Sequence, residues 1–165
     1  MNHIRTVALI GLAATSFLIR HARAETPEEW IKLGDRVHGG FGAFIPVGIR
    51  IGLDALQRLH AEPRQVSVVY FDSDKAPCAC VADGVAIATV ASVGQRTLQI
   101  ASEKAPSGAM AMIIVRNKQS GATVKYTVSD SWVPKLIDMN KTLDIRGRYD
   151  AVMNADGLFE VSAGK

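Results

Sequence analysis

Two glycines four residues apart within a helical pattern are the feature that most constrains the fold of this chain. In GIRIGLDALQRLH, residues 48–60, a stripe at spacings of three and four predicts a helix that Glu62-Pro63 closes. Gly48 and Gly52 leave one side of this helix thin, and each glycine costs about 1 kcal/mol relative to alanine. We therefore expect a second helix to pack closely against the thin side, with a nearby ligand as the alternative reason.

The elements around this helix predict an α+β fold in a single domain, residues 25–165. A first helix begins with a capping box, in which Thr26 is the cap, Pro27 the first helical residue and Glu29 the partner. We expect the N-terminal helices to pack on a mainly antiparallel sheet. The further elements are expected as a strand at 65–71, a small-residue helix at 80–90, a strand at 96–102, a hairpin at 109–117 and 123–130, a short helix at 130–140 and a strand after 157.

The first 24 residues have the pattern of a secretory signal peptide. A short basic start precedes an apolar stretch at residues 6–19, which is too short to span a bilayer comfortably, and Ala22-Arg23-Ala24 is an A-x-A cleavage pattern. We therefore predict cleavage after Ala24 and a periplasmic or secreted mature protein; the alternative is an uncleaved N-terminal anchor. No later apolar run reaches spanning length, so no membrane association is expected after cleavage.

The charge of the mature chain argues against nucleic acid as a partner. Residues 1–24 hold three of the 19 basic residues and none of the 16 acidic ones, so 19 less three leaves 16 of each sign. A chain with this balance lacks the basic surface on which nucleic-acid binding depends. We expect no nucleic-acid partner.

The two cysteines of the chain, Cys78 and Cys80, are separated by one residue. An oxidising compartment favours disulfides, but an extended i,i+2 pair lies at or beyond the upper edge of the Cα separation of about 4.4–6.8 Å that a disulfide requires. A bridge between these cysteines would be strained, would close almost no loop and would stabilise the fold little. The spacing therefore favours redox chemistry or metal binding over a structural role.

Two stretches of the chain carry motifs that occur in the same order in a known family. HGGFGAFIPVGIRIG follows a pattern that begins H-G-H-x-[CG]-P and ends G-x-R-x-G, and CVADGVAIATVASVGQRTL follows one with Cys, D-G-I-Q, T-G-x-T-x-G and Leu. In both motifs and in their order the chain resembles the formylmethanofuran dehydrogenase E-subunit family. The resemblance covers about the first half of the mature chain. The matching residues are His38, Gly39, Gly48, Arg50, Gly52, Cys80, Asp83, Gly84, Thr89, Gly94 and Leu98, with Ser92 in place of a threonine.

This resemblance implies a metal bound through the histidine and cysteine of the two motifs, here His38 and Cys80, with Cys78 as an additional thiol. It also implies a homodimer. The family name derives from association with a molybdenum or tungsten enzyme whose catalytic centre is in other subunits, and a redox or metalloenzyme partner is a further expectation for this chain. The Cys-rich zinc module at the C-terminus of some members is absent from this sequence. The chain departs from the pattern at Gly40, Ala43 and Ala86, where the family has His, Pro and Gln. Gly42 occupies the Cys-or-Gly position and so provides no thiol.

The candidate metal ligands are His38, Cys78 and Cys80, which come from two separate loops. One imidazole nitrogen and two thiolate sulfurs suit zinc, and Cu(I) is the alternative because it prefers thiolates. The competing interpretation is a buried free Cys80 that packs as a small apolar residue and a His38 that caps the first helix.

Four further residues are candidates for a ligand pocket beside the metal or for support of its ligands: Arg50, Asp83, Thr89 and Ser92. Asp83 could orient His38 or accept a backbone amide at a helix start, and we favour the helix start. Arg50 could bind an anionic ligand, but we favour an ion pair with Asp54, four residues on.

Thr89 and Ser92 fit a turn that lines a pocket. His60, at a helix end, is expected to be solvated or to cap the helix.

Three function classes fit these observations. No hydrolase, P-loop or H-E-x-x-H motif is present, so the sequence favours a binding or accessory protein over an enzyme. We predict a periplasmic metal- or cofactor-binding accessory protein; the alternatives are a small thiol redox protein and a ligand-binding homodimer that has lost its metal.

Overall fold

The structure is a computed structural model that describes residues 25–164. The predicted signal peptide, residues 1–24, lies outside the described residues, so its cleavage stays a prediction. Among residues 25–164, no helix is both long enough and apolar enough to cross a bilayer.

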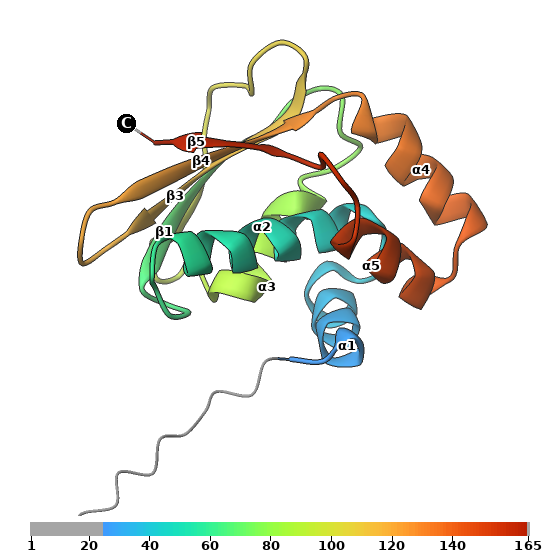
Figure 1. Ribbon diagram of the computed structural model, residues 1–165, viewed down its shortest axis with the longest axis horizontal. Helices are drawn as coiled ribbons and strands as arrows, with labels where there is room; N and C mark the ends of the chain where they lie inside the picture. The colour runs from blue at the N-terminus through green and yellow to red at the C-terminus, as the bar shows by residue number, and fades with distance from the viewer. Residues whose placement is uncertain (1–24, 165) are drawn as a thin grey trace, which may run out of the picture.

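One five-stranded sheet, in the order β2-β1-β3-β4-β5, carries the helices α2 and α3 on one side (Figure 1). Within the described sheet β1 and β2 are parallel and the other neighbours are antiparallel, which confirms the predicted α+β fold with helices on a mainly antiparallel sheet. The strands are β1 (Val66–Phe71), β2 (Leu98–Ile100), β3 (Ala109–Asn117), β4 (Thr123–Ser129) and β5 (Glu160–Ala163). The helices are α1 (Pro27–His38), α2 (Phe44–Arg58), α3 (Cys80–Thr89), α4 (Trp132–Thr142) and α5 (Ile145–Met153).

The core lies between the sheet and helices α2 and α3. Along β1 the residues Val66, Val68 and Tyr70 are buried and those between them are partly exposed, because successive side chains of a strand point to opposite faces. Ile45 and Ile49 of α2 are fully buried. The sheet thus buries one face, and α2 is the central helix of the layer that covers it.

The predicted close packing of the glycine-containing helix is confirmed, and the partner is α3. A Cβ atom added at Gly48 would lie 2.8 Å from the Cα of Gly84, and one added at Gly84 would lie 2.9 Å from the Cα of Gly48. Side-chain carbons do not approach a backbone so closely, so only glycine fits at these two positions. The contact holds the N-terminal half of α3, and with it Cys80, at a fixed distance from α2.

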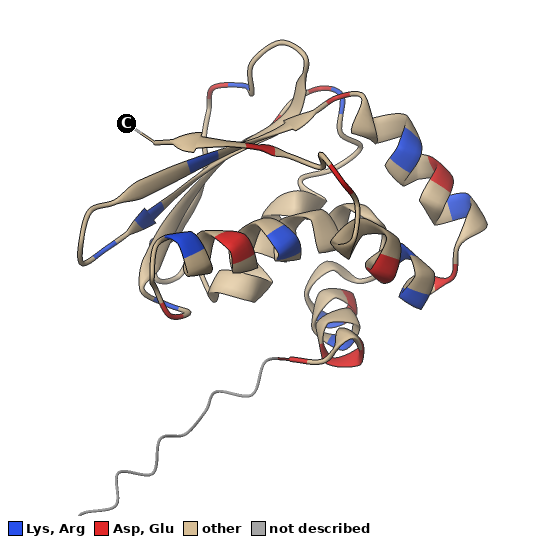
Figure 2. Ribbon diagram, viewed as in Figure 1, with Lys and Arg blue, Asp and Glu red and all other residues tan. Residues whose placement is uncertain are grey.

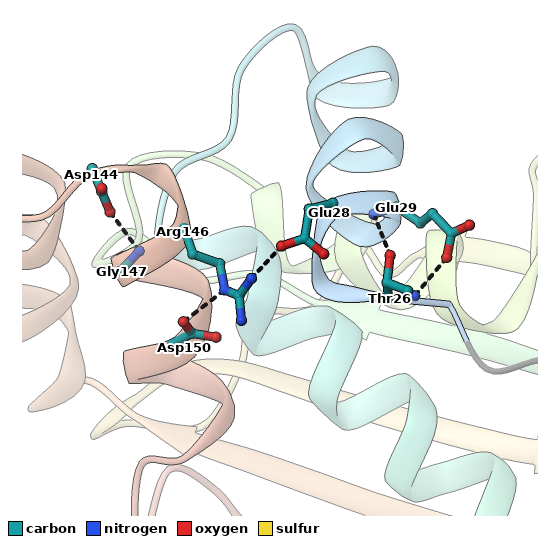
Figure 3. Close-up of polar contacts among 7 residues, drawn as sticks. All are labelled: Thr26, Glu28, Glu29, Asp144, Arg146, Gly147 and Asp150. Atoms are coloured by element: carbon teal, nitrogen blue, oxygen red, sulfur yellow. Dashed lines mark hydrogen bonds and ion pairs between the residues drawn. The ribbon is translucent and has the colours of Figure 1, made fainter.

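Helix α1 buries fewer of its residues than α2 does. Its capping box is as predicted: Thr26 Oγ1 accepts from Glu29 N, and Glu29 Oε2 accepts from Thr26 N (Figure 3). Two of its residues are buried, Trp30 and Gly34. At its outer side Arg146 of α5 pairs with Glu28 and with Asp150, so an exposed arginine links α1 to α5 (Figure 3).

Several predicted boundaries differ from the structure. Helix α2 ends at Arg58, before the predicted stop at residues 62–63, and His60 is exposed with a φ of 46°. Strand β2 keeps three residues of the predicted seven. Helix α5 was not predicted, because Gly147 and the scattered apolar residues of IRGRYDAVM hide its helical period; Asp144 caps it by accepting from Gly147 N at 2.7 Å.

A buried tyrosine makes the stability of the fold depend on pH. The Tyr126 side chain is fully buried, packs edge-on against Phe159 at 5.2 Å, and has no hydrogen-bond partner for its hydroxyl within the described structure. Burial raises the pKa of Tyr126 well above its ordinary value, and the nearby Asp54 carboxylate raises it further. The folded protein therefore keeps this proton at a pH where the unfolded chain loses it, and stability falls as the pH rises above about 10.

We expect Tyr126→Phe to be as stable as the wild type or up to about 1 kcal/mol more stable at pH 7, because it removes an unpaired buried hydroxyl without changing shape. Above about pH 10 the advantage of the variant should grow, since phenylalanine has no proton to lose. Urea unfolding of both proteins between pH 7 and pH 11 measures this. A variant that loses stability at pH 7 would show that the hydroxyl has a stabilising partner.

Candidate metal site

The three predicted metal ligands lie together in the structure. The ligand atoms of His38, Cys78 and Cys80 are all within 4.8 Å of one another. His38 is the last residue of α1, Cys78 lies in the loop after β1, and Cys80 is the first residue of α3. Residues 40 positions apart in the sequence thus meet where the end of α1 reaches the start of α3.

Local backbone geometry places these side chains. Gly39 ends α1 directly after His38 with a φ of 83°, and its amide donates to Asp35 O. This left-handed conformation suits glycine, and it turns the chain away so that His38 stays at the open end of the helix. On the other side, the contacts of Gly48 with Val81 and Gly84 hold the first half of α3, which begins at Cys80.

Asp83 orients the His38 imidazole. The distance from His38 Nδ1 to Asp83 Oδ2 is 2.7 Å, and both side chains are about one third exposed. Our preferred role for Asp83, a hydrogen bond to a backbone amide at the helix start, is wrong: the N-cap of α3 is Ala79, without a side-chain cap. A carboxylate on Nδ1 leaves Nε2 available to a metal, which is the usual support for a metal-binding histidine.

The sulfurs of Cys78 and Cys80 are joined as a disulfide. Their Cα atoms are 5.3 Å apart, well inside the usual range, so the predicted obstacle to a bridge is not present. The reason is the intervening Ala79, whose φ of −77° and ψ of 28° turn the backbone where an extended residue was assumed. Cys80 is buried with 6% of its surface exposed, and Cys78 is partly exposed.

Tyr70 was not predicted as part of the site, and it is connected to this group through Asp83, whose carboxylate raises the pKa of the tyrosine. Its side chain is fully buried, and its hydroxyl donates to Asp72 Oδ1 at 3.4 Å. Burial raises the pKa of Tyr70 most, then the carboxylate of Asp72, and Asp83 also raises it. In the sequence Tyr70 is one more core-facing residue of a strand, so only its place two residues before Asp72 could have indicated a position near the site.

Arg50 is not part of the group formed by the histidine and the cysteines. Its guanidinium donates to the carbonyl oxygens of Val152 at 2.9 Å and Ala155 at 2.6 Å, and it lies over the Phe159 ring at 5.4 Å. The predicted ion pair with Asp54 is wrong, because Asp54 accepts from Arg58 instead. Figure 2 shows these basic and acidic residues alternating along α2.

Thr89 and Ser92 also lie apart from the three ligands, at the other end of α3. Thr89 Oγ1 donates to Val85 O at 2.7 Å, and Ser92 Oγ accepts from Gln95 N at 3.2 Å. Ser92 belongs to the lining of a groove of about 470 Å³ between α1 and α3, whose other residues are mainly apolar. Of the four supporting candidates, the structure brings only Asp83 to the metal ligands.

The sequence model of one protein family, described as "FmdE, Molybdenum formylmethanofuran dehydrogenase operon", matches residues 37–155. The chain belongs to the FmdE family. The match begins one residue before His38, contains Cys78, Cys80 and Asp83, and continues beyond the two motifs through α4 and α5. The FmdE resemblance seen in the motifs is therefore confirmed over most of the described chain. A comparison with curated proteins finds no significant match.

Proposed function

We propose that this FmdE-family chain is an exported accessory protein that binds one metal ion through His38, Cys78 and Cys80 when both cysteines are reduced. The observation that carries the proposal is the convergence of the three ligand atoms within 4.8 Å. The orientation of His38 by Asp83 supports it, because such a carboxylate fixes which ring nitrogen faces the metal.

Zinc is the metal that this ligand set fits best. A borderline-soft ion takes imidazole nitrogen and thiolate sulfur, and zinc sites with three protein ligands keep a fourth position open. Cu(I) is the alternative, since thiolates also suit it. The open position could accept water or a donor from a partner.

The accessory role and the compartment rest on two further observations. The family description refers to the operon of a molybdenum enzyme, which supports a role beside a metalloenzyme. The signal-peptide pattern of residues 1–24 supports export to the periplasm. The homodimer that the resemblance implies stays a prediction.

The test is a zinc titration of the mature chain, residues 25–165, kept reduced by a phosphine that does not bind zinc. We expect one zinc per chain in competition with a chromogenic chelator, and cobalt in its place should give thiolate-to-metal charge-transfer absorption. His60→Gln is the matched control, because His60 is exposed and outside the group, and it should bind like the wild type. A reduced wild type that takes up neither zinc nor Cu(I) would overturn the proposal.

A further inference from the structure

The two sulfurs that would bind the metal are the same two atoms that form the disulfide. Cys78 and Cys80 belong to the His38 group, and they are bonded to each other in the structure. A metal needs both as thiolates, and a disulfide contains none. The metal-bound and bridged forms of this site therefore exclude each other.

The site requires little movement to pass from one form to the other. In the bridged form the His38 nitrogen is already within 4.8 Å of both sulfurs, and His38 is already held by Asp83. The Cα separation of 5.3 Å suits the bridge without a change in the loop. The bridge spans one residue and adds little to the stability of the fold, so its formation and loss can occur in the folded protein.

The two cysteines differ in their access to an outside reagent. Cys78 is partly exposed in the loop before α3, whereas Cys80 has 6% of its surface exposed and packs in the core. Thiol–disulfide exchange depends on access to the attacked or attacking sulfur. Cys78 is thus the sulfur that an outside disulfide can meet, and Cys80 is placed to react only with Cys78.

We propose that this protein undergoes thiol–disulfide exchange at Cys78 that releases the metal, an inference that rests on the proposed function. The Cys78 thiolate attacks an outside disulfide, forms a mixed disulfide and releases one outside thiolate. The Cys80 thiolate then attacks the Cys78 sulfur, forms the Cys78–Cys80 bond and releases the second outside thiolate. The two cysteines lose two electrons, the outside disulfide gains them, and the metal leaves as a cation because both of its sulfur ligands are gone.

The experiment treats the zinc-loaded mature chain with glutathione disulfide. A chromogenic indicator measures free zinc, and mass spectrometry measures bridges and glutathione adducts. We expect one zinc released for each Cys78–Cys80 bridge formed, and full rebinding after reduction. With Cys80→Ser a stable glutathione adduct should accumulate on Cys78. With Cys78→Ser the adduct on Cys80 should form at least about 10-fold more slowly, because Cys80 is buried.

The outcomes separate this inference from the proposed function. If the reduced wild type binds no metal, the proposed function fails. If the wild type binds zinc but keeps it while the bridge forms, or if Cys80 reacts with glutathione disulfide as fast as Cys78, the exchange reaction is overturned and metal binding stands. Adducts on Cys78→Ser and Cys80→Ser are also measured without metal. The circular dichroism of each variant, compared with that of the wild type, shows whether the variant has a folding defect.

Discussion

A Gly48→Ala variant is expected to lose about 3 kcal/mol or more of its free energy of unfolding, which is a large part of the stability of a domain of this size. The new Cβ would lie 2.7 Å from Val85 N and 2.8 Å from Gly84 Cα. Both atoms belong to the backbone of α3, so no side chain can rotate away to make room. Helices α2 and α3 would have to separate, and the core between them would open.

Urea unfolding followed by circular dichroism measures this loss, with Gly40→Ala as the matched control. A Cβ at Gly40 meets nothing within 4 Å, so this variant should unfold within about 0.5 kcal/mol of the wild type. If Gly48→Ala and Gly40→Ala unfold at the same urea concentration, the close contact of Gly48 with Gly84 is wrong.

A Cys80→Ser variant is expected to bind zinc more than about 100-fold more weakly than the reduced wild type. It removes one of the three ligands, whereas loss of a residue that only orients a ligand costs about 10–100-fold. Asp83→Asn should therefore fall between Cys80→Ser and the wild type, because the amide oxygen can still accept from His38 Nδ1 but is a weaker acceptor than the carboxylate.

Competition titrations under reducing conditions rank the three proteins, with His60→Gln as the variant that should not change affinity. The graded order is the informative result. Equal affinities for Asp83→Asn and the wild type would show that the contact of His38 with Asp83 does not support the metal. Equal affinities for Cys80→Ser and the wild type would remove Cys80 from the ligand set.

The sequence predicted those parts of the fold whose cause is local. The capping box of Thr26 and Glu29 depends on four consecutive residues, and the hairpin of β3 and β4 depends on alternation around one glycine-containing loop. The close approach of a second helix to α2 was also predictable. Two glycines destabilise a helix, and close packing of another backbone is the usual structural reason for their presence. The partner helix was identified only by the structure.

The parts that were missed depend on contacts between distant segments. Asp83 is directed to His38 by the packing of α1 against α3, and Arg50 is directed to the carbonyl oxygens at the end of α5, which was not predicted. The bridge was underestimated because a single residue, Ala79, is turned and not extended. The three candidate metal ligands were found by their chemical type and by a resemblance, whereas their convergence was visible only in the folded chain.

The limited burial of α1 affects how fast a metal could enter or leave the candidate site. A helix that buries two residues opens locally at a lower free energy than α2, so its amide hydrogens should exchange with solvent before those of the core. Each such opening carries His38 away from Cys78 and Cys80, while the α2–α3 core stays closed. A bound metal would join α1 to α3 and slow this opening, so hydrogen exchange in residues 27–38 would report the occupancy of the site.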